Sequence, residues 1–424
     1  MDAQSESPHQ ISIRNNICLT YPDNWKIVDI KQIFDVHNGS TPKSSVDAYW
    51  NGDISWITPA DMVESKYIEK SSRFITSEGF HSCNLTMADP GDIVISCRAP
   101  IGSINIVSRP MCTNQGCKLL KPKCEIDTSF YYYFLCSQKD VLNSLGRGTT
   151  FMELSTDDLN NYTVPLPDVE IQHRIVSFLD FKCGNLNDII KYNKSIIDEL
   201  SNLKQSIISE TVTRGLNPNA SLKDSGIDWI GMIPNTWNVI KLKYLVTVSN
   251  TKSSSYSSFL GLENVESWTG RYIDTEMCSS GEGSISINAG DLCFSKLRPY
   301  LAKVIIAPFD GACSSEFIVF NHFDGDVRYL KYLMLTSNFI EEVNSSTYGT
   351  KMPRANWDFI GSMYVPNVPF NEQVQISDYL DQVCYTIDSI IDSVKYSSSK
   401  IQQYMQSLIY EYVTGKRSVD MEAP

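Results

Sequence analysis

The sequence lacks the features of a membrane or secreted protein. No apolar run approaches the roughly 18 to 20 residues that a membrane-spanning helix requires. The first ten residues are polar and include Asp2 and Glu6, so we expect no secretory signal there. Hydrophobic residues make up 42% and charged residues 20%, which is ordinary for globular domains. We therefore expect a soluble cytoplasmic protein, and 424 residues predict two to three domains.

Metal-binding and redox motifs are missing. The 12 cysteines are scattered and no two are spaced as Cys-x-x-Cys, which indicates reduced thiols rather than a disulfide framework. The five histidines lie far apart, without His-x-x-x-His or His-x-Glu spacing. We predict no metal site in this chain.

Catalytic motifs are missing as well. No phosphate-binding Gly-x-x-x-x-Gly-Lys-Ser/Thr loop occurs, because Gly415-Lys416-Arg417 lacks the upstream glycine and the hydroxyl. No Asn/Asp-Pro-Pro-Tyr/Phe tetrapeptide, typical of amino-methyltransferases, is present. Asp53 with Glu64-Ser65-Lys66 imitates a nuclease pattern, but such triplets are common by chance. We predict no catalytic residues and no cofactor bound by this chain.

Positive charge is scarce. The formal net charge is -13, and no large segment of the chain is basic. Phosphate contacts require Lys and Arg, so DNA binding would depend on local loops or on positive charge from a partner.

Two parts of the chain repeat each other. Pro22-Asp23-Asn24-Trp25 returns as Pro234-Asn235-Thr236-Trp237. From about residue 148 to 214, matching residues lie a constant 201 positions apart, as Gln172 and Gln373 do. Each copy therefore consists of one variable globular unit followed by one constant unit.

The constant unit has the periodicity of a long helix. Apolar residues follow one another at alternating steps of four and three, which is the pattern of a coiled coil. Gly215 and Gly415 stand where the two helices are expected to end. A lone helix would expose its apolar stripe, so we expect an antiparallel coiled coil about a pseudo-two-fold axis. The predicted seam consists of Leu186, Ile189, Asn193, Ile196, Leu200, Leu203, Ile207, Ile387, Ile390, Val394, Ile401, Tyr404 and Leu408.

The variable units read as mixed α/β, which makes the expected fold class α+β. Short apolar runs bounded by Gly, Pro, Asp and Ser predict buried strands. Two aromatic stretches, Thr128 to Leu135 and Val327 to Leu335, predict helices packed on those strands. The predicted strands are Ile93-Val94-Ile95, Lys118-Leu119-Leu120, Leu292-Cys293-Phe294, Val304-Ile305-Ile306 and Phe317-Ile318-Val319-Phe320.

Several local motifs accompany this alternation. They are Gly39-Ser40-Thr41-Pro42 with Asp53-Ile54-Ser55-Trp56-Ile57, the pair Asn114-Gln115-Gly116-Cys117 and Ser314-Ser315-Glu316-Phe317, and the stretch from Asp224 to Gly231 with Pro234 and Trp237. Layout and motifs together resemble the specificity (S) subunit of Type I restriction-modification systems. One departure is Glu170-Ile171-Gln172, where the second copy has the family's adjacent Glu372-Gln373.

The resemblance implies a non-catalytic DNA reader. Two target recognition domains would each contact one half of a bipartite, asymmetric DNA site. The helix pair would act as a ruler and as the docking surface for two methyltransferase subunits, which bring S-adenosylmethionine and methylate adenine at N6. Restriction subunits that use ATP and Mg²⁺ are possible further partners.

The resemblance also sets the expected domain order. It is a polar tail (1–14), target recognition domain 1 (15–167), helical spacer 1 (168–215), a linker (216–233), target recognition domain 2 (234–366), helical spacer 2 (367–416) and a C-terminal tail (417–424).

Polar and basic residues in Gly/Ser-rich loops are the candidates for DNA contacts. Arg and Lys bind guanine edges, Asn and Gln bind adenine, and hydroxyls bind phosphates. The candidates are Lys43, Ser44, Arg98, Arg147, Thr149, Lys252, Ser254, Tyr256, Lys296, Arg298, Tyr348 and Lys351.

Other functions remain open at this point. The chain could be a coiled-coil scaffold or a regulatory or inhibitory relative that no longer reads DNA, which the acidic balance favours. A stand-alone nuclease or methylase would require metal or S-adenosylmethionine binding by this chain.

Overall fold

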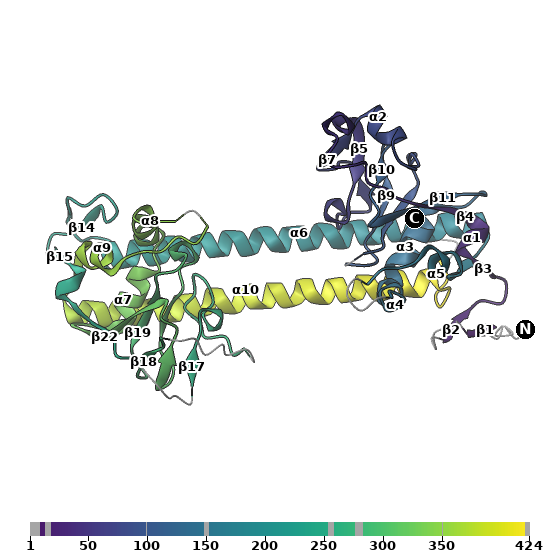
Figure 1. Ribbon diagram of the computed structural model, residues 1–424. Coiled ribbons are helices and arrows are strands. Elements are labelled where there is room, and N and C mark those ends of the chain that lie inside the picture. Colours follow the sequence, from purple (N-terminus) through teal and green to yellow (C-terminus); the bar gives the residue numbers. More distant parts are fainter. Residues whose placement is uncertain are drawn as a thin grey trace, which may run out of the picture. The chain divides into compact units, whose positions relative to one another are not determined.

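Each of the two globular domains is followed in the chain by a helix of more than 40 residues, α6 (Val169–Arg214) and α10 (Phe370–Val413) (Figure 1). The computed structural model describes residues 9–12, 18–98, 100–147, 152–252, 258–275, 283–349 and 351–419. The chain divides into unit 1 (Met1–Tyr192 and Ser397–Pro424) and unit 2 (Asn193–Tyr396). Each unit therefore holds one globular domain, part of α6 and part of α10.

The start of each long helix is fixed by the glutamine that repeats at 201 residues. In unit 1, the Gln172 side chain donates to the Pro167 carbonyl at 2.8 Å and accepts from the Asp127 amide at 2.8 Å. In unit 2, Gln373 makes the same two bonds, to the Val368 carbonyl and from the Asp326 amide, at 2.8 and 2.9 Å. Both glutamines are buried, so each bond ties a helix start to its own domain.

The predicted helix ends are confirmed. α6 ends at Arg214 and α10 at Val413. Gly215 and Gly415 follow with φ of 74° and 70°, the left-handed region that favours glycine.

Within each unit, the two helix segments pack against each other. In unit 2, Ile208 and Val212 share a core with Ile376 and Leu380, and Lys204 bonds Asp388, so the segments run antiparallel. In unit 1, the Phe178 ring packs against the tilted ring of Tyr412, with ring centroids 4.5 Å apart. The same steps of four and three recur in both helices, at Leu179, Cys183, Leu186, Ile190, Asn193, Ile197, Leu200, Lys204, Ile207 and Thr211, and at Leu380, Cys384, Ile387, Ile391, Val394, Ser398, Ile401, Met405, Leu408 and Tyr412; all of these are buried or half-buried.

The predicted seam is therefore wrong at every second position. Ile189, Ile196, Leu203, Ile390 and Tyr404 are each at least 43% exposed. The sequence offers isoleucine at both members of the pairs 189–190 and 196–197, so two apolar ladders fit one helix, and packing selects the later member. The remaining predicted seam residues, Leu186, Asn193, Leu200, Ile207, Ile387, Val394, Ile401 and Leu408, lie on the observed ladder.

The domain of unit 1 is built on a five-stranded sheet of order β4-β11-β8-β9-β6. A three-stranded sheet of order β10-β5-β7 and the pairs β1-β2 and β3-β12 complete it. Its elements are β1 (His9–Ser12), β2 (Cys18–Tyr21), β3 (Lys26–Asp29), α1 (Ile30–Ile33), β4 (Phe34–Asn38), η1 (Asp47–Tyr49), β5 (Trp50–Ile57), η2 (Pro59–Asp61), β6 (Tyr67–Ile68), β7 (Arg73–Ile75), α2 (Ser77–His81), β8 (Ile93–Ser96), β9 (Ile104–Val107), β10 (Cys112–Thr113), β11 (Cys117–Pro122), α3 (Thr128–Ser137), α4 (Lys139–Ser144), α5 (Thr156–Asn160) and β12 (Thr163–Leu166).

The domain of unit 2 has the same plan, with a four-stranded sheet of order β16-β22-β19-β20. A three-stranded sheet of order β17-β21-β18 and the pairs β13-β14 and β15-β23 accompany it. Its elements are β13 (Leu222–Asp224), β14 (Met232–Pro234), β15 (Asn238–Lys241), η3 (Leu242–Tyr244), β16 (Val246–Ser249), β17 (Phe259–Leu260), η4 (Leu262–Asn264), β18 (Ile285–Ile287), β19 (Leu292–Ser295), η5 (Pro299–Leu301), β20 (Val304–Ile306), β21 (Gly311–Cys313), β22 (Phe317–Phe323), α7 (Val327–Met334), α8 (Ser337–Ser345), α9 (Trp357–Ser362) and β23 (Tyr364–Asn367).

The aromatic helices α3 and α7 form the cores between sheet and long helices, as the sequence predicts. Phe130 to Leu135 are all buried, and Tyr131 meets Phe34 edge to face at 5.3 Å. In unit 2, Tyr329 is buried on α7 and donates its hydroxyl to the Val212 carbonyl of α6 at 3.0 Å. The five predicted buried strands are confirmed as parts of β8, β11, β19, β20 and β22.

Candidate nucleic-acid interface

Three loops of unit 1 meet beyond the end of β8 and carry two of the predicted contact residues. Arg98 and Arg147 each form an isolated β-bridge with Glu153. The Cys97 amide donates to the Gly116 carbonyl at 2.8 Å, and the Leu154 amide donates to the Cys97 carbonyl at 2.9 Å. These backbone bonds hold the loops as one cluster.

Unit 2 repeats this backbone frame. Leu297 and Tyr348 each form a β-bridge with Arg354. The Lys296 amide donates to the Glu316 carbonyl at 2.9 Å, and the Ala355 amide donates to the Lys296 carbonyl at 2.8 Å. The frame brings Lys296, Arg298 and Tyr348 together, whereas the side chains differ from those of unit 1 at nearly every position.

The charges in the two clusters are balanced differently. In unit 1, Arg98 pairs with Glu153 at 3.0 Å and Arg147 pairs with Asp158 at 2.7 Å. In unit 2, Glu316 pairs with Arg354 at 2.7 Å. Lys296 and Lys351 have no ion pair within the described part of the chain. The second cluster thus offers unpaired lysines, and the first offers arginines that already hold a carboxylate.

Arg298 has unusual geometry. Its backbone lies in the left-handed region at φ 49°, and the buried Nε has no hydrogen-bond partner. Backbone strain of this kind costs about 1 to 3 kcal/mol and persists only where surrounding contacts impose it. Here the Arg298 amide donates to the Pro353 carbonyl at 2.8 Å, which fixes the loop against Pro353.

A second loop of unit 1, residues 39–44, holds Lys43 and Ser44. The Trp56 indole donates to the Ser40 carbonyl at 3.0 Å, and the Trp50 indole donates to the Lys43 carbonyl at 3.3 Å. A Cβ at Gly39 would overlap the Asn114 carbonyl, so the close approach requires glycine. Trp50 and Trp56 therefore shape the loop that presents Lys43.

Arg73 is a candidate that the sequence alone does not reveal. Arg73 is exposed on strand β7, and its guanidinium lies 4.0 Å from the Trp50 ring centroid and 5.1 Å from that of Trp56. Stacking on tryptophan orients a guanidinium without neutralising its charge. No sequence signal separates Arg73 from other surface arginines, because the stack forms between neighbouring strands.

The remaining predicted residues divide into two groups. Lys252 is exposed and forms a β-bridge with Ile285, and Lys351 is exposed beside the second cluster. Thr149, Ser254 and Tyr256 lie outside the described residues.

The described segments show neither an activated thiol beside the first cluster nor a metal-binding group. Burial raises the pKa of the Cys97 thiol beside the first cluster and that of Cys112 to about 12, so neither is an activated nucleophile. Among the described residues, no group of three or more His, Cys, Asp or Glu could hold a metal ion. Across the same residues, no helix is both long and apolar enough to cross a membrane.

Comparison with known proteins agrees with this arrangement. The family model of the Type I restriction modification DNA specificity domain matches twice, at residues 22–202 and 234–393. The chain belongs to this family. Both copies of the specificity domain include a loop cluster and the first part of the long helix that follows it.

Two curated relatives and one solved structure extend the comparison. The type I restriction enzyme EcoDI specificity subunit of Escherichia coli is 24% identical over 95% of this chain and 90% of its own length. The MjaIX specificity subunit of Methanocaldococcus jannaschii is 34% identical, over 41% of this chain and 40% of its own. A structure from work on assembly and conformational transition of the type I R-M system has a TM-score of 0.69 at 16% identity, covering 94% of this chain and 99% of that one, and shows the same fold.

Proposed function

We propose that this chain is the DNA sequence-specificity subunit of a type I restriction-modification complex and reads a bipartite, asymmetric site. The observation that carries the proposal is the repeated loop cluster, with one backbone frame and two sets of side chains. The bridges at Glu153 and Arg354 are equivalent, yet the flanking residues are Arg98 and Arg147 in one copy and Leu297 and Tyr348 in the other. Equivalent frames with different readers would recognise two different half-sites.

The long helices would dock the catalytic partners. In unit 2, Ile196 and Leu203 on α6 and Ile390 on α10 are 43%, 51% and 44% exposed. Aliphatic side chains exposed at helical spacing are what a partner subunit covers. We propose that two methyltransferase subunits bind there, with restriction subunits as possible further partners. Those subunits would supply S-adenosylmethionine, ATP and Mg²⁺ in the cytoplasm, and this chain would have no catalytic role.

The net negative charge of this chain is consistent with DNA phosphates being contacted mainly by partner subunits. Methyltransferase subunits that close around the DNA would provide most positive charge, and this chain would provide base contacts. Isolated S subunit should then bind DNA far more weakly than the assembled complex does. Equal affinity of the two would contradict this division.

The test is co-expression with a methyltransferase subunit of the same system and mapping of N6-methyladenine by single-molecule sequencing. A motif with two short specified halves and an unspecified gap is the expected result. Arg98→Ala should relax or abolish recognition of one half only, and Lys296→Ala should affect the other half. A stable complex without methylation would favour a regulatory copy, and absence of a complex would favour the scaffold.

A further inference from the structure

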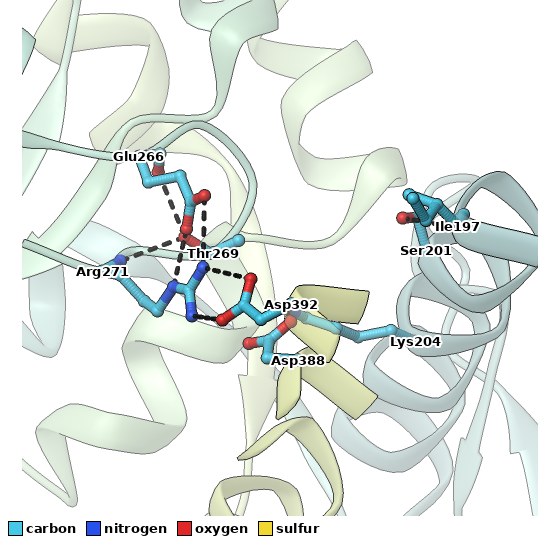
Figure 2. Close-up of polar contacts among 8 residues, drawn as sticks. All are labelled: Ile197, Ser201, Lys204, Glu266, Thr269, Arg271, Asp388 and Asp392. Carbon is cyan, nitrogen blue, oxygen red and sulfur yellow. Dashed lines mark hydrogen bonds and ion pairs between the residues drawn. The ribbon is translucent and has the colours of Figure 1, made fainter. Parts of the chain in front are cut away.

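Domain 2 is the globular domain of unit 2, and its candidate reading loop is the loop that carries Arg298. A hairpin of this domain, residues 265–272, joins the reading loop to the long helix α10. Figure 2 shows Arg271 between Glu266 of the same hairpin and Asp392 of α10. Arg271 Nε donates to Glu266 Oε2 at 2.7 Å, and Nη1 donates to Asp392 Oδ2 at 2.9 Å. Both carboxylates have pKa values lowered first by their hydrogen bonds with Arg271, so the pair is ionised at neutral pH.

The hairpin itself is tightly built. The Glu266 amide donates to the Arg271 carbonyl at 2.9 Å, and Thr269 Oγ1 donates to Glu266 Oε2 at 2.7 Å. Gly270 has φ 66°, and a Cβ there would lie 2.4 Å from the Val304 carbonyl oxygen of β20. The segment cannot change shape without losing these contacts.

The other side of the hairpin contacts the Arg298 loop. The Trp268 amide donates to the Ala302 carbonyl at 3.2 Å. Ala302, like Arg298, has a left-handed backbone, at φ 45°, and it ends the short helix η5 that follows Arg298. Asp392, Arg271, Trp268 and Ala302 therefore form a continuous connection from α10 to the candidate reading loop.

The described residues of unit 1 form no equivalent of this connection. Residue 191, the counterpart of Asp392 at the 201-residue offset, is a lysine. In unit 1, Lys66 forms an ion pair with Asp180 of α6 at 2.6 Å. Lys66 belongs to the segment that packs on β9, the counterpart of β20. Asp180 corresponds to Asp381, 11 residues before Asp392, or about 16 Å at 1.5 Å per residue. Asp381 itself binds Arg328 and Tyr332 of α7, so Asp392 gives domain 2 a further attachment point on α10.

We propose that Arg271 is a positioning residue that sets where along α10 the reading loop of domain 2 is held, and so fixes the gap length of the recognised site. The inference rests on the proposed function. Reading a half-site one base pair away requires a shift of about 3.4 Å along the DNA axis. The ion pair to Asp392 adds to the contacts that hold domain 2 on α10, and its loss would lower the free-energy cost of such a shift.

The experiment compares methylation by complexes that contain the wild-type chain, Arg271→Ala, Asp392→Asn or Asp392→Glu. Wild type should methylate sites of one gap length. Arg271→Ala and Asp392→Asn should methylate sites with a gap one base pair longer or shorter about two- to fivefold more than wild type does, which is the factor expected from losing an exposed ion pair. The recognised bases of both half-sites should stay the same in all variants. Asp392→Glu keeps the negative charge and should methylate sites of the single wild-type gap length.

Glu210→Gln is the matched control, because Glu210 and Arg214 form a similarly exposed ion pair within α6. All variants should melt within about 2 °C of wild type, since exposed ion pairs contribute little to stability. Hydrogen exchange of the isolated full-length chain gives a readout independent of DNA. Asp392→Asn should accelerate exchange at residues 265–272 and at 298–302, and Glu210→Gln should not.

An unchanged single gap length in Arg271→Ala and Asp392→Asn would refute the inference. Altered bases in the second half would also refute it, because Arg271 would then contact DNA itself. If hydrogen exchange is faster in Asp392→Asn but the wild-type complex methylates no bipartite site, the connection through Arg271 is confirmed and the proposed function is refuted. The role of Arg271 in setting the gap length is then refuted as well.

Discussion

The most exacting test of the packing concerns Lys204, a charged residue within the helix seam. Its side chain is 7% exposed and donates to Asp388, 17% exposed, at 2.7 Å. The pair lines a cavity of about 560 Å³ next to the 265–272 hairpin. Removing one partner of a buried ion pair costs about 3 to 5 kcal/mol, because the other charge stays buried and uncompensated. The cavity leaves Asp388 some access to water, so we expect a loss near 3 kcal/mol for Lys204→Met.

The repeat itself supplies the compensating change. At the 201-residue offset, the counterparts of Lys204 and Asp388 are Met405 and Asn187, so an uncharged pair is compatible with the same seam. Lys204→Met with Asp388→Asn should therefore recover most of the lost stability. For a unit of about 200 residues, 3 kcal/mol corresponds to a fall of about 6 to 12 °C in melting temperature. Circular dichroism of both single variants and the double variant completes the cycle. A single variant as stable as wild type, or a double variant no better than the single, would refute the reasoning.

Three further outcomes are expected. Gln373→Leu leaves the Asp326 amide and the Val368 carbonyl without their partner and should cost about 2 to 4 kcal/mol in denaturant unfolding, whereas a loss below 1 kcal/mol would show that water replaces both bonds. Gly39→Ala should displace the 39–44 loop and reduce methylation at sites that depend on the first half, with little change in melting temperature; unaltered methylation would exclude this loop from recognition. Because the folded-state pKa of Asp392 is lowered, its contribution to stability is present at neutral pH and is lost as the pH falls below about 4. The melting temperature of wild type should therefore fall more steeply than that of Asp392→Asn between pH 5 and 3, and parallel curves would contradict the ion pair.

The sequence predicts the large features because each is encoded in a local pattern. Apolar runs predict β8 and β19, aromatic runs predict α3 and α7, and glycines mark the ends of both long helices. The seam is only half predictable, because two apolar ladders lie on each helix and only packing decides between them. Lys204 belongs to the observed ladder although a charged residue does not suggest a core position.

The candidate site is less predictable for a different reason. Basic residues in polar loops can be found in a sequence, but their partners cannot. Glu153 lies far from Arg98 in the sequence, and the two meet only when the loops are folded. Asp158 is closer to Arg147, but nothing in the sequence indicates that these two side chains pair. Arg73 becomes a candidate only when two strands place it over Trp50.

The pairing of Arg98 with Glu153 has a consequence for how selective such a contact is. A guanidinium that already holds a carboxylate gains little by exchanging it for an isolated phosphate, because one ion pair replaces another and Glu153 is left without its partner. Only a base edge with two well-placed acceptors, such as that of guanine, offers Arg98 enough interaction free energy to compensate for the lost ion pair with Glu153. An arginine restrained in this way would add little to random sliding along DNA and much to the difference between a correct and an incorrect base.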